Sequence, residues 1–176
     1  AAAKRIQERE AAFKRELSAQ SEQNQLFLKD NREAFAANQK AWEEKFLSGE
    51  ETKERYRAAS LKNIEDYQNT VRQLINNAYT IDAQGKSGTE LQNVSLKRDS
   101  ALTALDREVA AEKAGLEKTI TDRSKAEDEK RAAAAAAANR TIIELGAAKT
   151  ETLIKQFELL AAKEIITEKQ KTEIIG

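Results

Sequence analysis

The spacing of apolar residues along this chain predicts helices throughout. In residues 2–47 apolar positions recur every eleven residues, and in residues 51–80 they step by three and four. An eleven-residue repeat corresponds to about 3.67 residues per turn, and alternating steps of three and four form the coiled-coil heptad. The first set is Ile6, Leu17 and Leu28 with Phe13, Asn24, Phe35 and Phe46; the second is Ile64, Tyr67, Val71, Leu74, Ala78 and Ile81. We therefore predict an all-α fold of long helices with coiled-coil-like packing, arranged as an extended hairpin or an elbow.

The principal break in this pattern is a capped turn at residues 85–89, which separates a first helical arm, residues 1–84, from a second, residues 90–176. Gly85 suits the position after a helix end, where φ is positive. Ser87 and Glu90 have the spacing of a capping box, and Thr89 begins a second such box. The predicted break and cap residues are Gly85, Ser87, Gly88, Thr89 and Glu90.

A weaker break is predicted inside the first arm. The sequence Leu47-Ser48-Gly49-Glu50 interrupts the apolar spacing, and Gly costs about 1 kcal/mol relative to Ala in a helix interior. We expect a kink or short break near residues 48–50.

The second arm repeats the eleven-residue spacing and then changes character. Its apolar positions are Val94, Leu105 and Leu116, with Val109 and Ile120 beside them. A polar stretch and an alanine run at residues 132–138 follow. Folding the arms back at residue 85 pairs positions whose numbers sum to about 170–175. This places Phe35 and Trp42 opposite the alanine run, where large side chains would fill a groove of small ones.

The chain ends in a strongly apolar helix, which suggests docking. Its branched and aromatic residues include Leu153, Phe157, Leu160 and Ile165. We expect another chain, or another part of the fold, to bury them. With Phe35 and Trp42 they are the predicted packing and assembly residues.

Charge and chemistry argue against several functions. Lys and Arg number 30, as do Asp and Glu, so no net field attracts duplex nucleic acid. With no Cys and no His, the chain offers neither a Ser–His nor a Cys–His catalytic pair and no ordinary zinc site. Carboxylates such as Glu8 and Glu16 lie among Lys and Arg at helical spacings that favour surface ion pairs. We expect no catalysis, no cofactor and no metal.

The layout around the principal break resembles the small internal virion (ejection) proteins of short-tailed bacteriophages. The matching elements lie in QLINNAYTIDAQGKSGTELQNVSLKRDSALTALDREVAAEK, especially Gly85, Ser87, Gly88 and Leu91. The resemblance implies a non-enzymatic structural protein that leaves the virion interior and assembles into a ring or tube in the host envelope, at the outer membrane and periplasm. Implied partners are further copies of the chain, other virion core proteins and DNA passing through a channel.

Two other functions fit the same helices. One is a coiled-coil spacer or receptor-binding rod, as in a bacteriocin or a surface stalk, with residues 82–89 as the recognition tip. The other is a tape-measure or scaffolding segment, whose length is its main property. No run reaches the ~20 apolar residues of a spanning helix. The chain begins AAAKRIQ and holds no Met, so we expect a processed or partial chain and membrane contact only through segments outside it.

Overall fold

The computed structural model describes the backbone of residues 1–175 and the side chains of residues 1–162. It contains three helices, α1 (Ala2–Leu47), α2 (Lys53–Ala83) and α3 (Gly88–Ile175), and no strand occurs among residues 1–175. The all-α prediction is confirmed. The chain divides into two compact units, Ala1–Arg123 (unit 1) and Ser124–Gly176 (unit 2).

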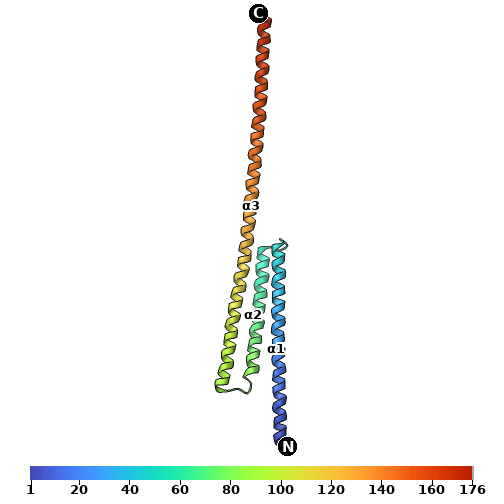
Figure 1. Cartoon of the computed structure of the whole chain (residues 1–176), viewed down its shortest axis with the longest axis vertical. Coiled ribbons are helices and arrows are strands. Elements are labelled where there is room, and N and C mark those ends of the chain that lie inside the picture. The colour runs from blue at the N-terminus through green and yellow to red at the C-terminus, as the bar shows by residue number, and fades with distance from the viewer. Residues whose placement is uncertain (176) are drawn as a thin grey trace. The chain divides into compact units, whose positions relative to one another are not determined.

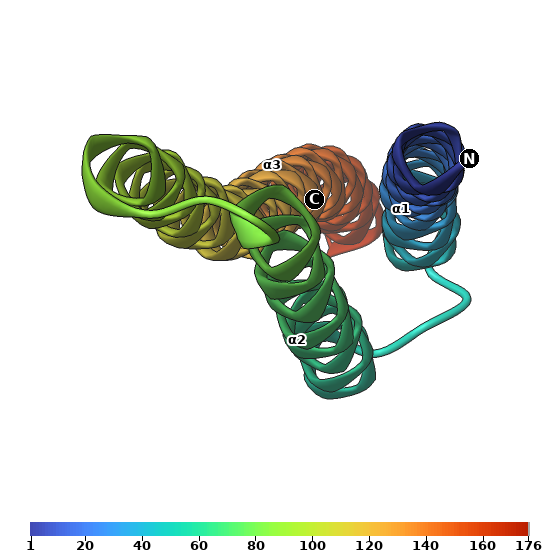
Figure 2. The ribbon, with the colours of Figure 1, turned by 90° about the horizontal axis from the view of Figure 1, so that it is seen from below.

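Unit 1 is an antiparallel bundle made by α1, α2 and the first part of α3. The chain runs along α1, returns along α2 and reverses again into α3 (Figure 1). Viewed along the helices, the three stand at the corners of a triangle, and the beginning of α3 diverges from α1 (Figure 2). The first turns of α1 extend past the turn that joins α2 to α3 (Figure 1). In the N-terminal part of α1, Ile6 and Phe13 are about half exposed, at 57% and 48%.

The break near residues 48–50 is a full reversal of the chain. Gly49 has φ +84°, and its N–H donates to the carbonyl of Phe46 while the N–H of Glu50 donates to that of Lys45. This pattern is the Schellman motif that ends a helix. Thr52 then caps α2, because its hydroxyl accepts from the N–H of Arg55 at 3.2 Å. Because a Schellman motif ends α1 and the Thr52 cap begins α2 only a few residues later, the chain turns back at this point instead of kinking.

The second turn keeps the predicted glycine, and the predicted cap residue Ser87 directly precedes α3. Helix α2 ends at Ala83 with Gln84 as its C-cap residue, and Gly85 follows with φ +72°. Among the described residues no hydrogen bond is recorded between Ser87 and Glu90, and Thr89, which begins the alternative box, lies inside α3. The first helical residue, Gly88, has a positive φ of +56°. A capping box needs helical φ between its two members, and Gly88 turns Ser87 away from that geometry.

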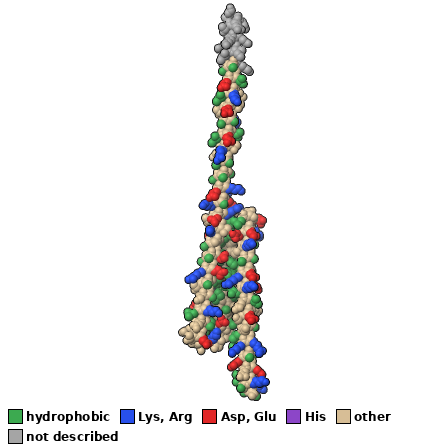
Figure 3. All heavy atoms as spheres, in the orientation of Figure 1, with side chains coloured by type: hydrophobic (Ala, Val, Ile, Leu, Met, Phe, Trp, Pro, Cys, Tyr) green, Lys and Arg blue, Asp and Glu red, His purple; other side chains and the backbone are tan. Residues whose placement is uncertain are grey.

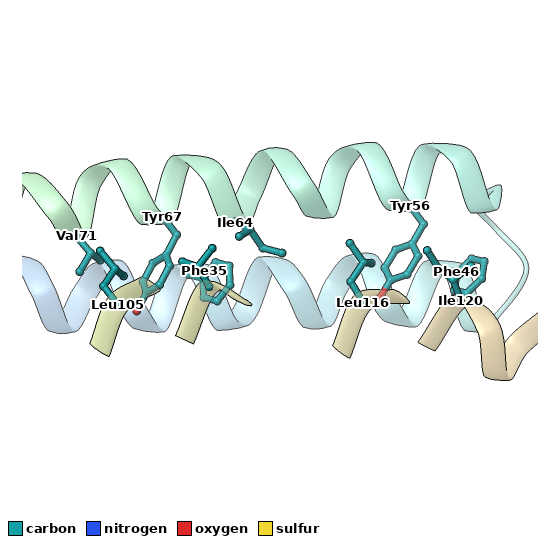
Figure 4. Close-up of a cluster of buried hydrophobic side chains, with 10 residues drawn as sticks. Phe35, Phe46, Tyr56, Ile64, Tyr67, Val71, Leu105, Leu116 and Ile120 are labelled. Atoms are coloured by element: carbon teal, nitrogen blue, oxygen red, sulfur yellow. The ribbon is translucent and has the colours of Figure 1, made fainter. Parts of the chain in front are cut away.

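The core of unit 1 is a narrow stripe along the bundle. Phe35 stacks on Tyr67 with ring centroids 4.2 Å apart, and Phe46 stacks on Tyr56 at 4.5 Å (Figure 4). From α3 the buried side chains are Leu105, Val109, Leu116 and Ile120. In α3 these are the eleven-residue positions and their neighbours, and in α1 the eleven-residue positions Asn24, Phe35 and Phe46 also face the bundle. The spacing therefore predicted the core-facing sides of all three helices.

The predicted pairing of Phe35 and Trp42 with residues 132–138 is wrong. Phe35 lies against Tyr67 of α2, Trp42 packs on the same core, and every alanine of the run is exposed. The error comes from the first turn, because a reversal at residue 49 gives α1 a partner much nearer in sequence. The predicted sum of about 170–175 does hold between α2 and α3, where Tyr67 contacts Glu108 and Arg57 contacts Glu117.

Candidate assembly surface

Polar contacts fix how the helices of unit 1 face one another. The Tyr67 hydroxyl donates to Glu108 at 2.8 Å, and Arg57 donates to both carboxylate oxygens of Glu117 at 2.9 and 3.1 Å. The Asn24 amide donates to the Leu74 carbonyl at 3.0 Å. Bonds of this kind, between residues far apart in sequence, specify the register of the helices more than they add stability.

The shifted pKa values belong to the same structural contacts. Burial raises the pKa of the Tyr67 hydroxyl, and the neighbouring Glu108 carboxylate raises it further. Burial likewise raises the pKa of Tyr56. The hydrogen bonds from Arg57 lower the pKa of the Glu117 carboxyl at an exposed site. Tyr67 and Glu117 each pair with a charged residue of another helix of unit 1, and Tyr56 is buried in the core, so the shifts accompany packing and pairing within the bundle.

A groove opens where α3 diverges from α1. Leu28, Leu74 and Val94 line it, and the Arg98 guanidinium lies over the Tyr79 ring at 4.2 Å from its centroid. Lys97 approaches Asp82 across its rim at 3.9 Å. The charged groups at this groove are paired with residues of the bundle itself, so they do not converge on an empty position.

The described residues offer no metal or membrane-spanning site. No group of His, Cys, Asp or Glu within the described part of the chain could hold a metal ion. Over the same residues, no helix is both long and apolar enough to cross a bilayer.

Eight of the fifteen large hydrophobic side chains that are exposed among the described residues lie on unit 2. Its described residues form one helix, part of α3, and hydrophobic side chains are spread along it (Figure 3). Three of the four predicted C-terminal assembly residues are more than half exposed: Leu153 at 53%, Phe157 at 67% and Leu160 at 56%. The side chain of Ile165 lies outside the described residues.

Five further large side chains belong to this surface. They are exposed by 51% to 70% of their area. They are Ile142, Ile143, Leu145, Ile154 and Leu159. Together with Leu153, Phe157 and Leu160 they form what we call the 142–160 surface. The predicted assembly set did not include them, although a count of three-and-four spacing upstream of Leu153 would have found Ile143.

The other predicted site residues belong to unit 1. Phe35 is buried in unit 1 and Trp42 is half-buried against the same core, so both act within the bundle. Gly85 and Gly88 belong to the turn between α2 and α3, and both have positive φ.

Comparison with known proteins adds no relative. No protein-family model matches the chain, and no curated protein and no solved structure shows significant similarity to it.

Proposed function

We propose that this chain is a non-enzymatic structural component of a phage DNA-ejection apparatus. Copies of it assemble with one another, and with other virion core proteins, into a ring or tube through which DNA crosses the host envelope. The observation that supports assembly is the 142–160 surface, where eight large apolar side chains are more than half exposed.

Exposure on this scale favours a partner chain. Soluble monomers rarely expose contiguous apolar patches beyond a few hundred Å², and larger patches mark interaction sites. Fully burying one large aliphatic or aromatic side chain contributes about 1.5–3 kcal/mol. An isolated helix also depends on packing for much of its stability. Covering the 142–160 surface therefore stabilises both the helix and the assembly.

The composition supports a structural role. The chain contains neither His nor Cys, and its 30 basic residues balance its 30 acidic ones. A charge-balanced wall would neither hold nor repel the phosphate backbone strongly, which suits a passive conduit. The placement in a virion, and afterwards in the host envelope, rests on the resemblance around Gly85, Ser87, Gly88 and Leu91.

Mass spectrometry of purified virions before and after DNA release tests this function. We expect the chain in intact particles and its loss from particles that have released their DNA. A stable capsid protein from the same particles serves as the internal standard. A chain absent from intact particles, or retained in full after release, would refute the ejection function, and retention would favour the scaffolding alternative.

A further inference from the structure

We propose that residues 132–160 form a parallel, in-register helical seam between copies of this chain, and that Asn139 fixes its orientation. This inference rests on the proposed assembly and adds the segment, the partner and the direction. It is carried by the spacing, the width and the charges of the helix surface.

The spacing calls for a partner helix. Alternating steps of four and three continue without interruption from residue 132 to residue 160. The positions are Ala132, Ala136, Asn139, Ile143, Gly146, Thr150, Leu153, Phe157 and Leu160. A stripe with a period of 3.5 residues stays in contact only with another helix that supercoils around it. At 1.5 Å per residue the seam is about 42 Å long.

The width of the apolar surface indicates two neighbours for each helix. Ile142, Leu145 and Leu159 lie on one flank of the seam, and Ile154 lies on the other. A two-stranded coiled coil covers a narrow stripe and would leave Leu145 and Leu159 exposed. An arrangement in which each copy contacts a neighbour on both sides covers both flanks, as in a closed cyclic assembly.

The charges favour copies that run in the same direction. Lys149 lies on one flank, and Glu144, Glu151 and Glu158 lie seven residues apart on the opposite flank. Parallel neighbours place the lysine flank of one copy against the glutamate flank of the next. Antiparallel neighbours place glutamates against glutamates, which repel.

The position of Asn139 also favours the parallel over the antiparallel arrangement. It is the one side-chain amide among the nine seam positions. In a parallel, in-register seam the Asn139 side chains of neighbouring copies lie in one layer and can hydrogen-bond to one another. In the antiparallel arrangement with full overlap, Asn139 lies opposite Leu153, where a buried amide has no partner.

The charge pattern also disfavours an anionic lipid surface as the occupant. Helices that lie on such membranes carry Lys and Arg on the polar face. In this helix the polar face is bordered by Glu144, Glu151 and Glu158. The basic residues Arg140, Lys149 and Lys155 equal these glutamates in number, so the face carries no excess positive charge.

The absence of cysteine allows a direct test on the full chain. Two single-cysteine variants, Ala132→Cys and Leu160→Cys, mark positions about 42 Å apart along the helix. They are mixed, allowed to assemble and oxidised, and the disulfides are identified by mass spectrometry. Ala148→Cys, on the outer face of the helix, is the matched control and is expected to remain uncrosslinked.

A parallel, in-register seam gives 132–132 and 160–160 disulfides and no 132–160 disulfide. Adding Asn139→Leu to both variants should retain association but raise the 132–160 product from background to the share expected for random orientation. If 132–160 dominates without that substitution, the seam is antiparallel and the inference fails while assembly stands. If the product pattern is unchanged by Asn139→Leu, Asn139 does not fix the orientation. If the chain does not associate, the inference fails together with the assembly on which it rests.

Discussion

Replacing Ile64 by Ala tests the packing of unit 1. Ile64 is fully buried, with 0% of its surface exposed, in the middle of α2 between the two aromatic stacks (Figure 4). The change removes three carbon atoms, worth about 2.4 kcal/mol at about 0.8 kcal/mol per buried methylene. The cavity left behind adds to this, and measured losses for such changes are about 2–5 kcal/mol. We expect a decrease of about 3–4 kcal/mol in the free energy of unfolding.

Trp42 makes the assay specific for unit 1. It is the one tryptophan of the chain and packs against the core of the bundle, so its fluorescence reports the unfolding of that unit. With a slope of about 2 kcal/mol/M in urea, the unfolding midpoint should fall by about 1.5–2 M. Leu96→Ala is the control, because Leu96 is 64% exposed and its loss should cost less than about 0.5 kcal/mol. Equal midpoints for the two variants would show that Ile64 is not in a packed core and would refute the bundle.

Four further substitutions test separate parts of the structure. Gly85→Ala forces a side chain into φ +72° and should destabilise unit 1 by about 1–2 kcal/mol. Gly115→Ala, inside α3 with open space at its Cβ, should instead stabilise unit 1 by up to about 1 kcal/mol. Urea titration of both variants checks that the two changes in unfolding free energy have opposite signs. The raised pKa of Tyr67 means that its contribution to stability is complete below the unfolded pKa of about 10 and is lost as the pH rises through the higher folded value. Tyr67→Phe should therefore lose stability less steeply above pH 10, and parallel curves for the two proteins would contradict this assignment. Leu160→Asp should disturb assembly more than helicity, because an unpaired charge buried between copies costs several kcal/mol; sedimentation and circular dichroism measure the two effects, and unchanged sedimentation would exclude Leu160 from the interface.

The helical fold and its core-facing stripes could be predicted because they depend on periodicity. The spacing of Ile64, Tyr67 and Val71 places them on one face of a helix, and all three are buried in the structure. The spacing of Leu105 and Leu116 did the same for α3. Periodicity says which face of a helix is covered but not which helix covers it, so it left the partners of these faces undetermined.

Which helix packs on α1 depends on the turn at residues 48–50, and the apolar spacing does not show how sharp that turn is. The sequence predicts a kink or short break near residues 48–50, and the positive φ of Gly49 with the Thr52 cap makes that break a full reversal of the chain. That single reversal moved Phe35 from a predicted contact with residues 132–138 to a stack on Tyr67. Gly49 and Thr52 stand in the sequence in the order of a helix end and a helix start, but the apolar spacing alone marks only one weak break there.

The 142–160 surface could be predicted only in part. Leu153, Phe157 and Leu160 stood out by their size, and the structure shows them exposed. Leu145 and Leu159 widen the surface but lie outside its three-and-four spacing. Periodicity therefore does not mark them, and only their exposure in the structure shows that they belong to the surface. Periodicity shows that this helix surface is apolar, but it does not identify the helix that packs against it.

Sedimentation equilibrium of the full chain tests the central claim most directly. The claim is that copies associate through the 142–160 surface. The chain has a mass of 19.6 kDa, and two neighbours for each copy require an assembly of at least three times that mass. We predict such a mass at micromolar concentration, and a return to 19.6 kDa when Leu153 and Phe157 are both replaced by Asp. A mass of 19.6 kDa for the unmodified chain at every concentration would contradict the claim.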